Sequence, residues 1–218
     1  MTQLQQSEST IYPGQFGNFT ITKSDRIGVI IYRSSLMVAA LSFALGTWLV
    51  LQMGDNPDVI QALTPLYGIF CLALGVSLLT IHIYMALLHR VLQVFWAIGT
   101  VAAAVVAVQN NQPLALFIYT HPVTLLGVGF TFAALTGIYF KEAVCFNRLE
   151  TKILMPLVPL LLLGHLAGIF PAIWEQILLG IWAILFAVFA FRKAVQAIPA
   201  DIGDKSVFAY LKQQSLAN

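Results

Sequence analysis

The sequence predicts an all-α polytopic membrane protein: six transmembrane helices in one bundle, with both termini cytoplasmic. Three observations support this fold class. Charged residues make up 9% of the 218-residue chain, against about 25% in ordinary soluble domains. Apolar residues reach 59%, above the soluble norm of roughly 45–50%. The apolar residues are also gathered into runs long enough to cross a hydrocarbon core of about 30 Å as helices.

The first element is a polar N-terminal arm, residues 1–26, which holds Pro13, Gly14 and Gly17. Phe16 and Phe19 predict a short extended piece within it. A six-helix transmembrane domain is expected over residues 27–191, followed by a cytoplasmic tail, 192–218, with a short helix. The spans are expected at about 34–53, 66–88, 91–108, 123–140, 153–169 and 173–191.

Turns separate these spans. Residues 54–58 contain Gly54 and Pro57, and residues 109–113 are polar and end in Pro113. We expect a tight hairpin at 89–90, because one helix from 66 to 108 would be more than about 60 Å long. Residues 114–120 predict a short interfacial or re-entrant helix. Arg33 must reach water, either from an interfacial helix or by snorkelling from the start of a long span.

The basic residues separate cleanly by side. All 11 Lys and Arg residues fall in the N-terminal segment, the 88–90 hairpin, the 141–152 loop or the tail. The loops at 54–62, 109–122 and 170–175 contain none. Because cytoplasmic loops carry the excess of Lys and Arg, this pattern supports six spans and two cytoplasmic termini.

No motif predicts an enzyme. There is no glycine-flanked serine of the rhomboid type, no His-Glu-x-x-His zinc motif, no phosphate-binding Gly-rich loop and no Cys-x-x-Cys pair. The membrane core as predicted holds no Asp or Glu for acid–base chemistry; Glu175 lies at the start of the last span, near the membrane surface. We therefore expect a non-enzymatic protein that has the lipid bilayer as its environment and does not bind nucleic acid.

Two histidines are candidate cofactor ligands. His82 and His165 are ionisable groups inside predicted spans, which makes them functional hypotheses by default. A neutral imidazole can ligate haem iron or a chlorophyll magnesium, whereas a histidine hydrogen-bonded to a neighbour is the commoner case. Their predicted depths, roughly 9 and 18 Å from the cytoplasmic ends, disfavour one haem held by both. His82 and His89, seven residues apart, would share a face of the second helix.

The loop 141–152 gathers more charge than any other segment between the outermost spans. Its mixed charges with interspersed apolar residues predict either a solvated loop or a docking surface for membrane protein complex subunits, helped by the tail at 201–205. The candidate docking residues are Lys141, Glu142, Arg148, Glu150 and Lys152.

Four segments carry a family resemblance: Tyr12-Pro13-Gly14-Gln15-Phe16-Gly17, Leu79-Thr80-Ile81-His82-Ile83-Tyr84, the run from Phe132 to Glu142, and Asp201-Ile202-Gly203-Asp204-Lys205-Ser206. Together they resemble an uncharacterised integral membrane protein family of cyanobacteria and plastid-bearing lineages, over nearly the whole chain. The resemblance implies a photosynthetic host, and hence a thylakoid or cell inner membrane.

These observations favour an accessory or assembly factor for photosynthetic or other membrane complexes. Two alternatives remain open from the sequence: a permease for a small neutral solute, and a pigment- or haem-binding membrane subunit.

Overall fold

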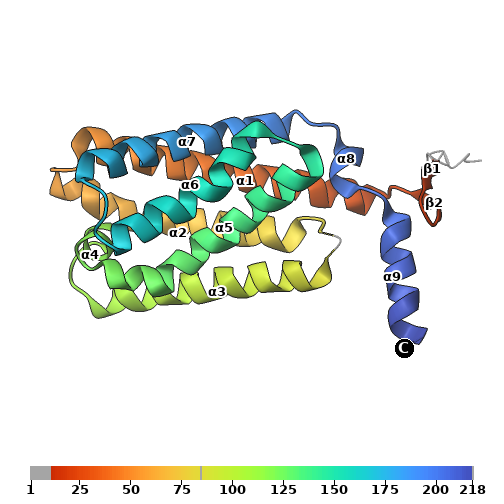
Figure 1. Ribbon diagram of the computed structural model, residues 1–218, viewed down its shortest axis with the longest axis horizontal. Helices are drawn as coiled ribbons and strands as arrows, with labels where there is room; N and C mark the ends of the chain where they lie inside the picture. The colour runs from red at the N-terminus through yellow and green to blue at the C-terminus, as the bar shows by residue number, and fades with distance from the viewer. Residues whose placement is uncertain (1–10, 84, 218) are drawn as a thin grey trace, which may run out of the picture.

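Six long helices lie side by side in one bundle (Figure 1). In this computed structural model, which describes residues 11–83 and 85–217, they are α1 (Lys23–Met53), α2 (Pro57–Thr80), α3 (Ala86–Gln109), α5 (Leu125–Phe146), α6 (Leu149–Leu166) and α7 (Ala172–Ala194). All six are long and apolar enough to cross a membrane. The predicted six-span all-α fold is confirmed.

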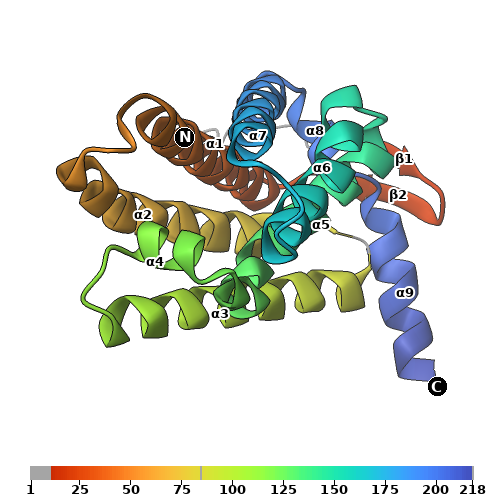
Figure 2. The same cartoon turned by 60° about the vertical axis from the view of Figure 1, so that its left-hand side comes forward.

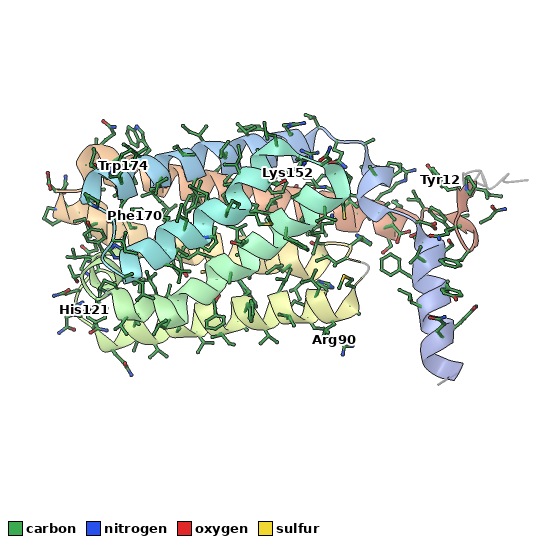
Figure 3. The ribbon with its side chains drawn as sticks, viewed as in Figure 1. Tyr12, Arg90, His121, Lys152, Phe170 and Trp174 are labelled. Carbon is green, nitrogen blue, oxygen red and sulfur yellow. The ribbon has the colours of Figure 1, made fainter. Side chains whose placement is uncertain are left out.

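The two ends of the described chain lie at the same end of the bundle (Figures 1 and 2). A hairpin of β1 (Ile11–Gly14) and β2 (Gly17–Thr20) precedes α1, while α8 (Ile198–Ile202) and α9 (Lys205–Ala217) follow α7. We call this end, where α1, α3 and α6 begin, the charged end, and the other the opposite end. Arg90 and Lys152 lie toward the charged end, and His121 and Trp174 toward the opposite end (Figure 3).

The first spanning helix starts earlier than expected, at Lys23 rather than near residue 34. Thr22 and Asp25 form a reciprocal capping box that starts it, since each satisfies a backbone amide of the other. Arg33 therefore lies inside a 31-residue helix, as in the long-span alternative. It does not snorkel to water, because an ion pair within the bundle holds it.

The turn after α2 also differs from expectation. α2 ends at Thr80, and the chain crosses to α3 before His89, because Ile81 and Ile83 bury their side chains in the core from non-helical backbone. The predicted hairpin at 89–90 is therefore wrong, and so is a helical face shared by His82 and His89. His89 belongs to α3, where its Nε2 lies 2.6 Å from the carbonyl oxygen of Leu78.

A short helix, α4 (Leu114–Thr120), and a 3-10 turn at Pro122–Thr124 connect α3 to α5 at the opposite end. This helix occupies the residues where the sequence predicts a short interfacial or re-entrant piece. The backbone amide of Leu114 donates to the Thr64 hydroxyl, 3.1 Å away, and so fastens the start of α4 to α2.

Aromatic side chains fill the centre of the bundle. Phe43 of α1 packs 4.5 Å from Trp182 of α7 between ring centroids, and Phe132 of α5 lies 5.2 Å from the same indole. α3 and α5 approach closely at Gly99, where an added Cβ would lie 2.2 Å from the backbone nitrogen of Thr131. The helices are thus held by close packing, as membrane bundles generally are.

Candidate functional site

Four of the five predicted docking residues are buried. Lys141, Glu142, Arg148 and Glu150 expose 8%, 0%, 8% and 3% of their surfaces, while Lys152 is exposed. The expectation of a solvated surface is therefore wrong for these four. Asn147, in the left-handed conformation with φ 52°, ends α5 and reverses the chain within two residues.

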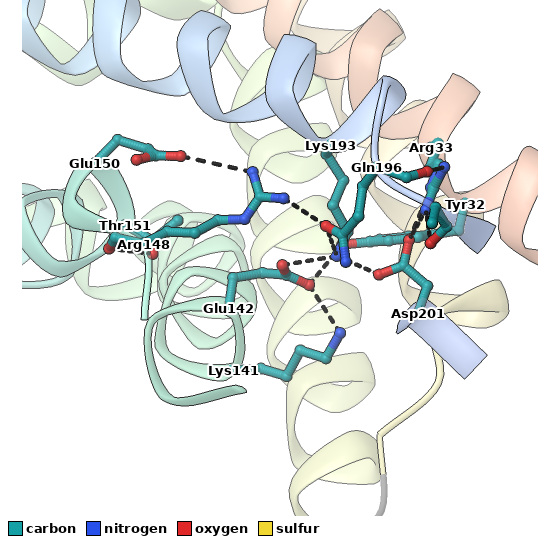
Figure 4. Close-up of polar contacts among 11 residues, drawn as sticks. Tyr32, Arg33, Lys141, Glu142, Arg148, Glu150, Thr151, Lys193, Gln196 and Asp201 are labelled. Carbon is teal, nitrogen blue, oxygen red and sulfur yellow. Dashed lines mark hydrogen bonds and ion pairs between the residues drawn. The ribbon is translucent and has the colours of Figure 1, made fainter. Parts of the chain in front are cut away.

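We call the inward-facing group the buried ion cluster (Figure 4). Its members share low exposure and direct polar contacts at the charged end. They are Arg33, Lys141, Glu142, Arg148, Glu150, Lys193 and Asp201.

Glu142 of α5 lies at the middle of this cluster. The Nζ of Lys193 donates to Oε2 over 2.7 Å, and the Nζ of Lys141 donates to Oε1 over 2.7 Å. The Tyr32 hydroxyl of α1 adds a 3.3 Å contact to Oε1. A carboxylate inside a membrane bundle is stable only with such partners, because an unpaired buried charge is costly.

A second part of the cluster fastens α8 to α1. The Nε of Arg33 donates to Oδ2 of Asp201 over 2.7 Å, and its Nη2 donates to the carbonyl oxygen of Ala197 over 3.2 Å. Lys193 also pairs with Asp201. Lys193 therefore bridges the carboxylates of α5 and α8 in a chain of ion pairs.

The third part joins the α5–α6 corner to α7. Arg148 donates to the side chain of Gln196 and lies 3.6 Å from Oε1 of Glu150. Arg192 donates to Oε2 of Glu150 over 2.6 Å. The ring of Phe146 lies among these cations, with the Nζ of Lys193 4.1 Å from its centroid, a distance at which cation–π attraction is appreciable.

This arrangement performs a structural task. Every carboxylate in it faces at least one cation, so none is a free general base, and the cluster joins α1, α5, α6, α7 and α8. Removing one member of a buried pair leaves an uncompensated charge, which costs far more than losing a surface pair. The charged end is thereby clamped.

The two candidate cofactor histidines lie at different ends. His165 of α6 has its Nδ1 2.7 Å from Oε1 of Glu175 and its Nε2 3.2 Å from the carbonyl oxygen of Tyr119. Both ring nitrogens therefore face oxygen partners. His82 lies in the α2–α3 connection near the charged end, and burial lowers its pKa, which keeps the imidazole neutral near pH 7. Among residues 11–83 and 85–217, no group of three or more metal-binding side chains comes together.

Segments near the two ends of the described chain form a unit that sequence reasoning missed. The backbone amide of Gln15 donates to Oδ2 of Asp204 over 2.6 Å, and that of Phe16 donates to the Ser206 hydroxyl over 3.0 Å. The Phe16 ring stacks on Tyr210 at 4.0 Å. We call this unit, made of β1, β2 and residues 203–214, the terminal platform.

A further ion pair joins the terminal platform to the bundle. Lys205 donates to Oδ2 of Asp25 over 2.7 Å, so α9 is held against the first turn of α1. Asp204 also accepts from the Ser206 amide at 2.9 Å and thus caps the start of α9. The Asp204 cap of α9 can be predicted from the local sequence. The contact between Gln15 and Asp204 cannot, because the two residues are 189 positions apart.

A family model describing an "Uncharacterized integral membrane protein (DUF2301)" matches residues 76–210. The chain belongs to this DUF2301 family. The matched region runs from the second half of α2 into α9 and includes every member of the buried ion cluster except Arg33. No curated protein and no solved structure matches the chain.

Proposed function

We propose that this DUF2301 protein is a non-enzymatic accessory or assembly factor for membrane complexes, and that its terminal platform is the surface that contacts them. The observation that carries this proposal is the platform itself: residues from both chain ends fold together beyond the first turn of α1 (Figures 1 and 2). The resemblance noted in the sequence favours a photosynthetic membrane as the setting.

The platform has the surface expected of a contact site. Ile11 is 65% exposed, Phe16 47% and Leu211 45%. These apolar side chains project from a polar hairpin and a short helix outside the six candidate spans. Exposed apolar groups rimmed by polar residues mark interaction sites in soluble parts of proteins.

The buried ion cluster holds the segment that leads into the terminal platform. Asp201 fastens α8 through Arg33 and Lys193, and α8 leads into α9 after only two residues. A platform held rigidly loses little conformational entropy on binding, which favours recognition. The 141–152 corner contributes by clamping the helices, and of its charged side chains only Lys152 is exposed to a partner.

A permeation path, and a pigment or haem site at His165, would each need a rearrangement. A permeation path would have to open both the aromatic centre around Phe43 and Trp182 and the buried ion cluster beyond it. Pigment or haem ligation by His165 would have to break its contacts with Glu175 and Tyr119. The accessory role uses the molecule as it stands.

The test is affinity purification of the tagged full-length protein from its native membrane in mild detergent. We expect recovery of one membrane complex in stoichiometric amounts. The double variant Ile11→Lys with Leu211→Lys changes exposed apolar side chains, and we expect it to lose that complex.

The variant Gln213→Lys is the control for added charge, since it places a lysine at an exposed polar position of α9 and should retain the complex. A wild-type protein that always purifies alone would contradict the proposal. So would a double variant that recovers the same complex as wild type.

A further inference from the structure

A pocket of about 180 Å³, partly open to the outside of the bundle, lies between the helices. It is bounded by α1, α2, α4, α5 and α7, and its α1 residues fall in the half of that helix nearer the opposite end. Phe43, Phe70 and Phe132 form part of its wall. These rings contact one another, with Phe70 and Phe132 5.8 Å apart between centroids, and they separate the cavity from the charged end.

Two hydroxyl-bearing residues on the cavity wall lack hydrogen-bond partners. Ser42 and Thr47 of α1 both line the cavity, and they are 8% and 6% exposed. Neither hydroxyl makes a hydrogen bond within residues 11–83 and 85–217. Neither oxygen is among the fully enclosed polar atoms without a partner, which include those of Ser77 and Thr100, so each borders the open space of the pocket. A ligand group placed there can supply the missing hydrogen bond.

Other hydroxyls of this chain show how such groups are normally satisfied. Thr80, Thr120 and Thr136 each donate to the carbonyl oxygen four residues earlier, at 2.8, 2.9 and 2.8 Å. Ser42 and Thr47 do not make this local bond. They lie five residues apart on α1, so they are spaced about 7.5 Å along the cavity wall.

The short helix α4 contributes Ala115 to the wall of the cavity. It is held at its start by the contact between Leu114 and Thr64, and at its end by the contact between Tyr119 and His165. The cavity is therefore bounded by packed helices, mostly apolar, with two hydroxyls presented by α1. Such a combination is the usual form of a small-molecule site.

From these features we infer that the cavity binds a small neutral amphiphile: a molecule with a compact apolar body and one hydrogen-bonding group, which pairs with Ser42 or Thr47. An engineered apolar protein cavity of about 150 Å³ accepts benzene, so a single substituted ring fits this volume. A charged ligand is excluded by the chemistry of the wall, which offers no ionic partner. This inference does not depend on the accessory role.

The test uses 4-fluorobenzyl alcohol as the probe and 4-fluorotoluene, which lacks the hydroxyl, as its comparator. Binding is followed by ¹⁹F NMR with the full-length protein in lipid nanodiscs, against empty nanodiscs. We expect a saturable protein-dependent signal for the alcohol. The variant Ser42→Ala with Thr47→Val should weaken alcohol binding about fivefold or more, while toluene binding stays unchanged.

Variants that fill the cavity provide a second test. Ser42→Leu should abolish binding of both probes. If Ser42→Leu does not fold, Ala115→Leu, which fills the cavity from α4, should also abolish binding of both probes. Thr80→Val is the matched control, because its hydroxyl bonds within its own helix away from the cavity, and it should bind like wild type.

Three results would overturn the inference. The first is no saturable signal in the wild type, as a cavity holding only water would give. The second is a signal that both cavity-filling variants leave unchanged. The third is equal loss of the alcohol and the toluene in the Ser42→Ala, Thr47→Val variant, since the hydroxyls would then not recognise the polar group.

Discussion

Lys193 of α7 donates a 2.7 Å hydrogen bond to Glu142 of α5, and both side chains are fully buried. This pair lies where two spanning helices end and the tail begins. The sequence alone suggests that these two charges are solvated, but the pair holds α5 and α7 together inside the bundle. The consequences for stability, for the terminal platform and for orientation in the membrane can each be measured.

The buried pair is the first target. Glu142→Gln removes the carboxylate that faces Lys193, Lys141 and Tyr32, and it leaves buried cations uncompensated. We expect a loss of about 3–5 kcal/mol in the free energy of unfolding, measured in mixed micelles by titration with a denaturing detergent. Lys152→Ala, on an exposed side chain of the same corner, should cost no more than about 1 kcal/mol. Equal effects of the two variants would show that the cluster does not clamp the bundle.

The contact between the hairpin and α9 depends on a missing side chain. A Cβ at Gly14 would lie 2.3 Å from Oδ1 of Asp204, so Gly14→Ala must separate the hairpin from α9. Losing the two hydrogen bonds that join them should raise tryptic cleavage after Lys205 about tenfold. Gly68→Ala is the control, since nothing lies within 4 Å of its added Cβ. Unchanged cleavage in Gly14→Ala would argue against the terminal platform.

The terminal platform should also loosen in acid. The Ser206 side chain and the Gln15 amide donate to Asp204 and hold the pKa of its carboxyl below the ordinary value of 3.8. A group with a lowered folded-state pKa contributes its full stabilisation above its unfolded-state pKa, about 3.9, and loses it as the pH falls through the folded-state pKa.

Amide hydrogen exchange of residues 11–20, measured between pH 6 and pH 3 and corrected for intrinsic rates, checks this expectation. Protection should persist at pH 6 and fall at the acid end. Asp204→Asn should show reduced protection at both pH values and little further change. A wild-type hairpin equally protected throughout would contradict the role of Asp204.

Orientation in the membrane is a separate prediction. The distribution of Lys and Arg predicts that the charged end faces the cytoplasm. In a background without native cysteines, Lys23→Cys and Asn111→Cys introduce thiols at exposed positions of the charged and opposite ends. A membrane-impermeant maleimide applied to intact cells should label only Asn111→Cys, and inverted vesicles should give the reverse. Labelling of Lys23→Cys from outside would reverse the predicted topology.

The fold was predictable because hydropathy reports membrane crossing directly. Six apolar runs and turns rich in Gly, Pro and Asn are sufficient for six spans. The starts of α1 and α6 were less predictable, because charged residues lie inside both helices. Arg33 and Glu150 lie inside α1 and α6, because partners distant in the sequence neutralise them.

The candidate site was predictable only in part. The charge density of residues 141–152 identified the right segment, but local sequence cannot tell a solvated carboxylate from one paired with Lys193, 51 positions later. The terminal platform shows the same limit. The family resemblance includes segments that contribute to both sides of this unit, residues 12–17 and 201–206. Nothing in either segment predicts the contact between Gln15 and Asp204, which forms only in the folded chain.

The most direct test of the account compares two surfaces in the native membrane. A photo-crosslinking amino acid replaces Leu211 on the terminal platform in one full-length variant, and Lys152 on the α5–α6 corner in another. If the terminal platform is the contact surface, position 211 should give a discrete adduct with one membrane protein, and position 152 a much weaker adduct or none. An adduct of equal or greater yield from position 152, or no adduct from position 211, would contradict that role.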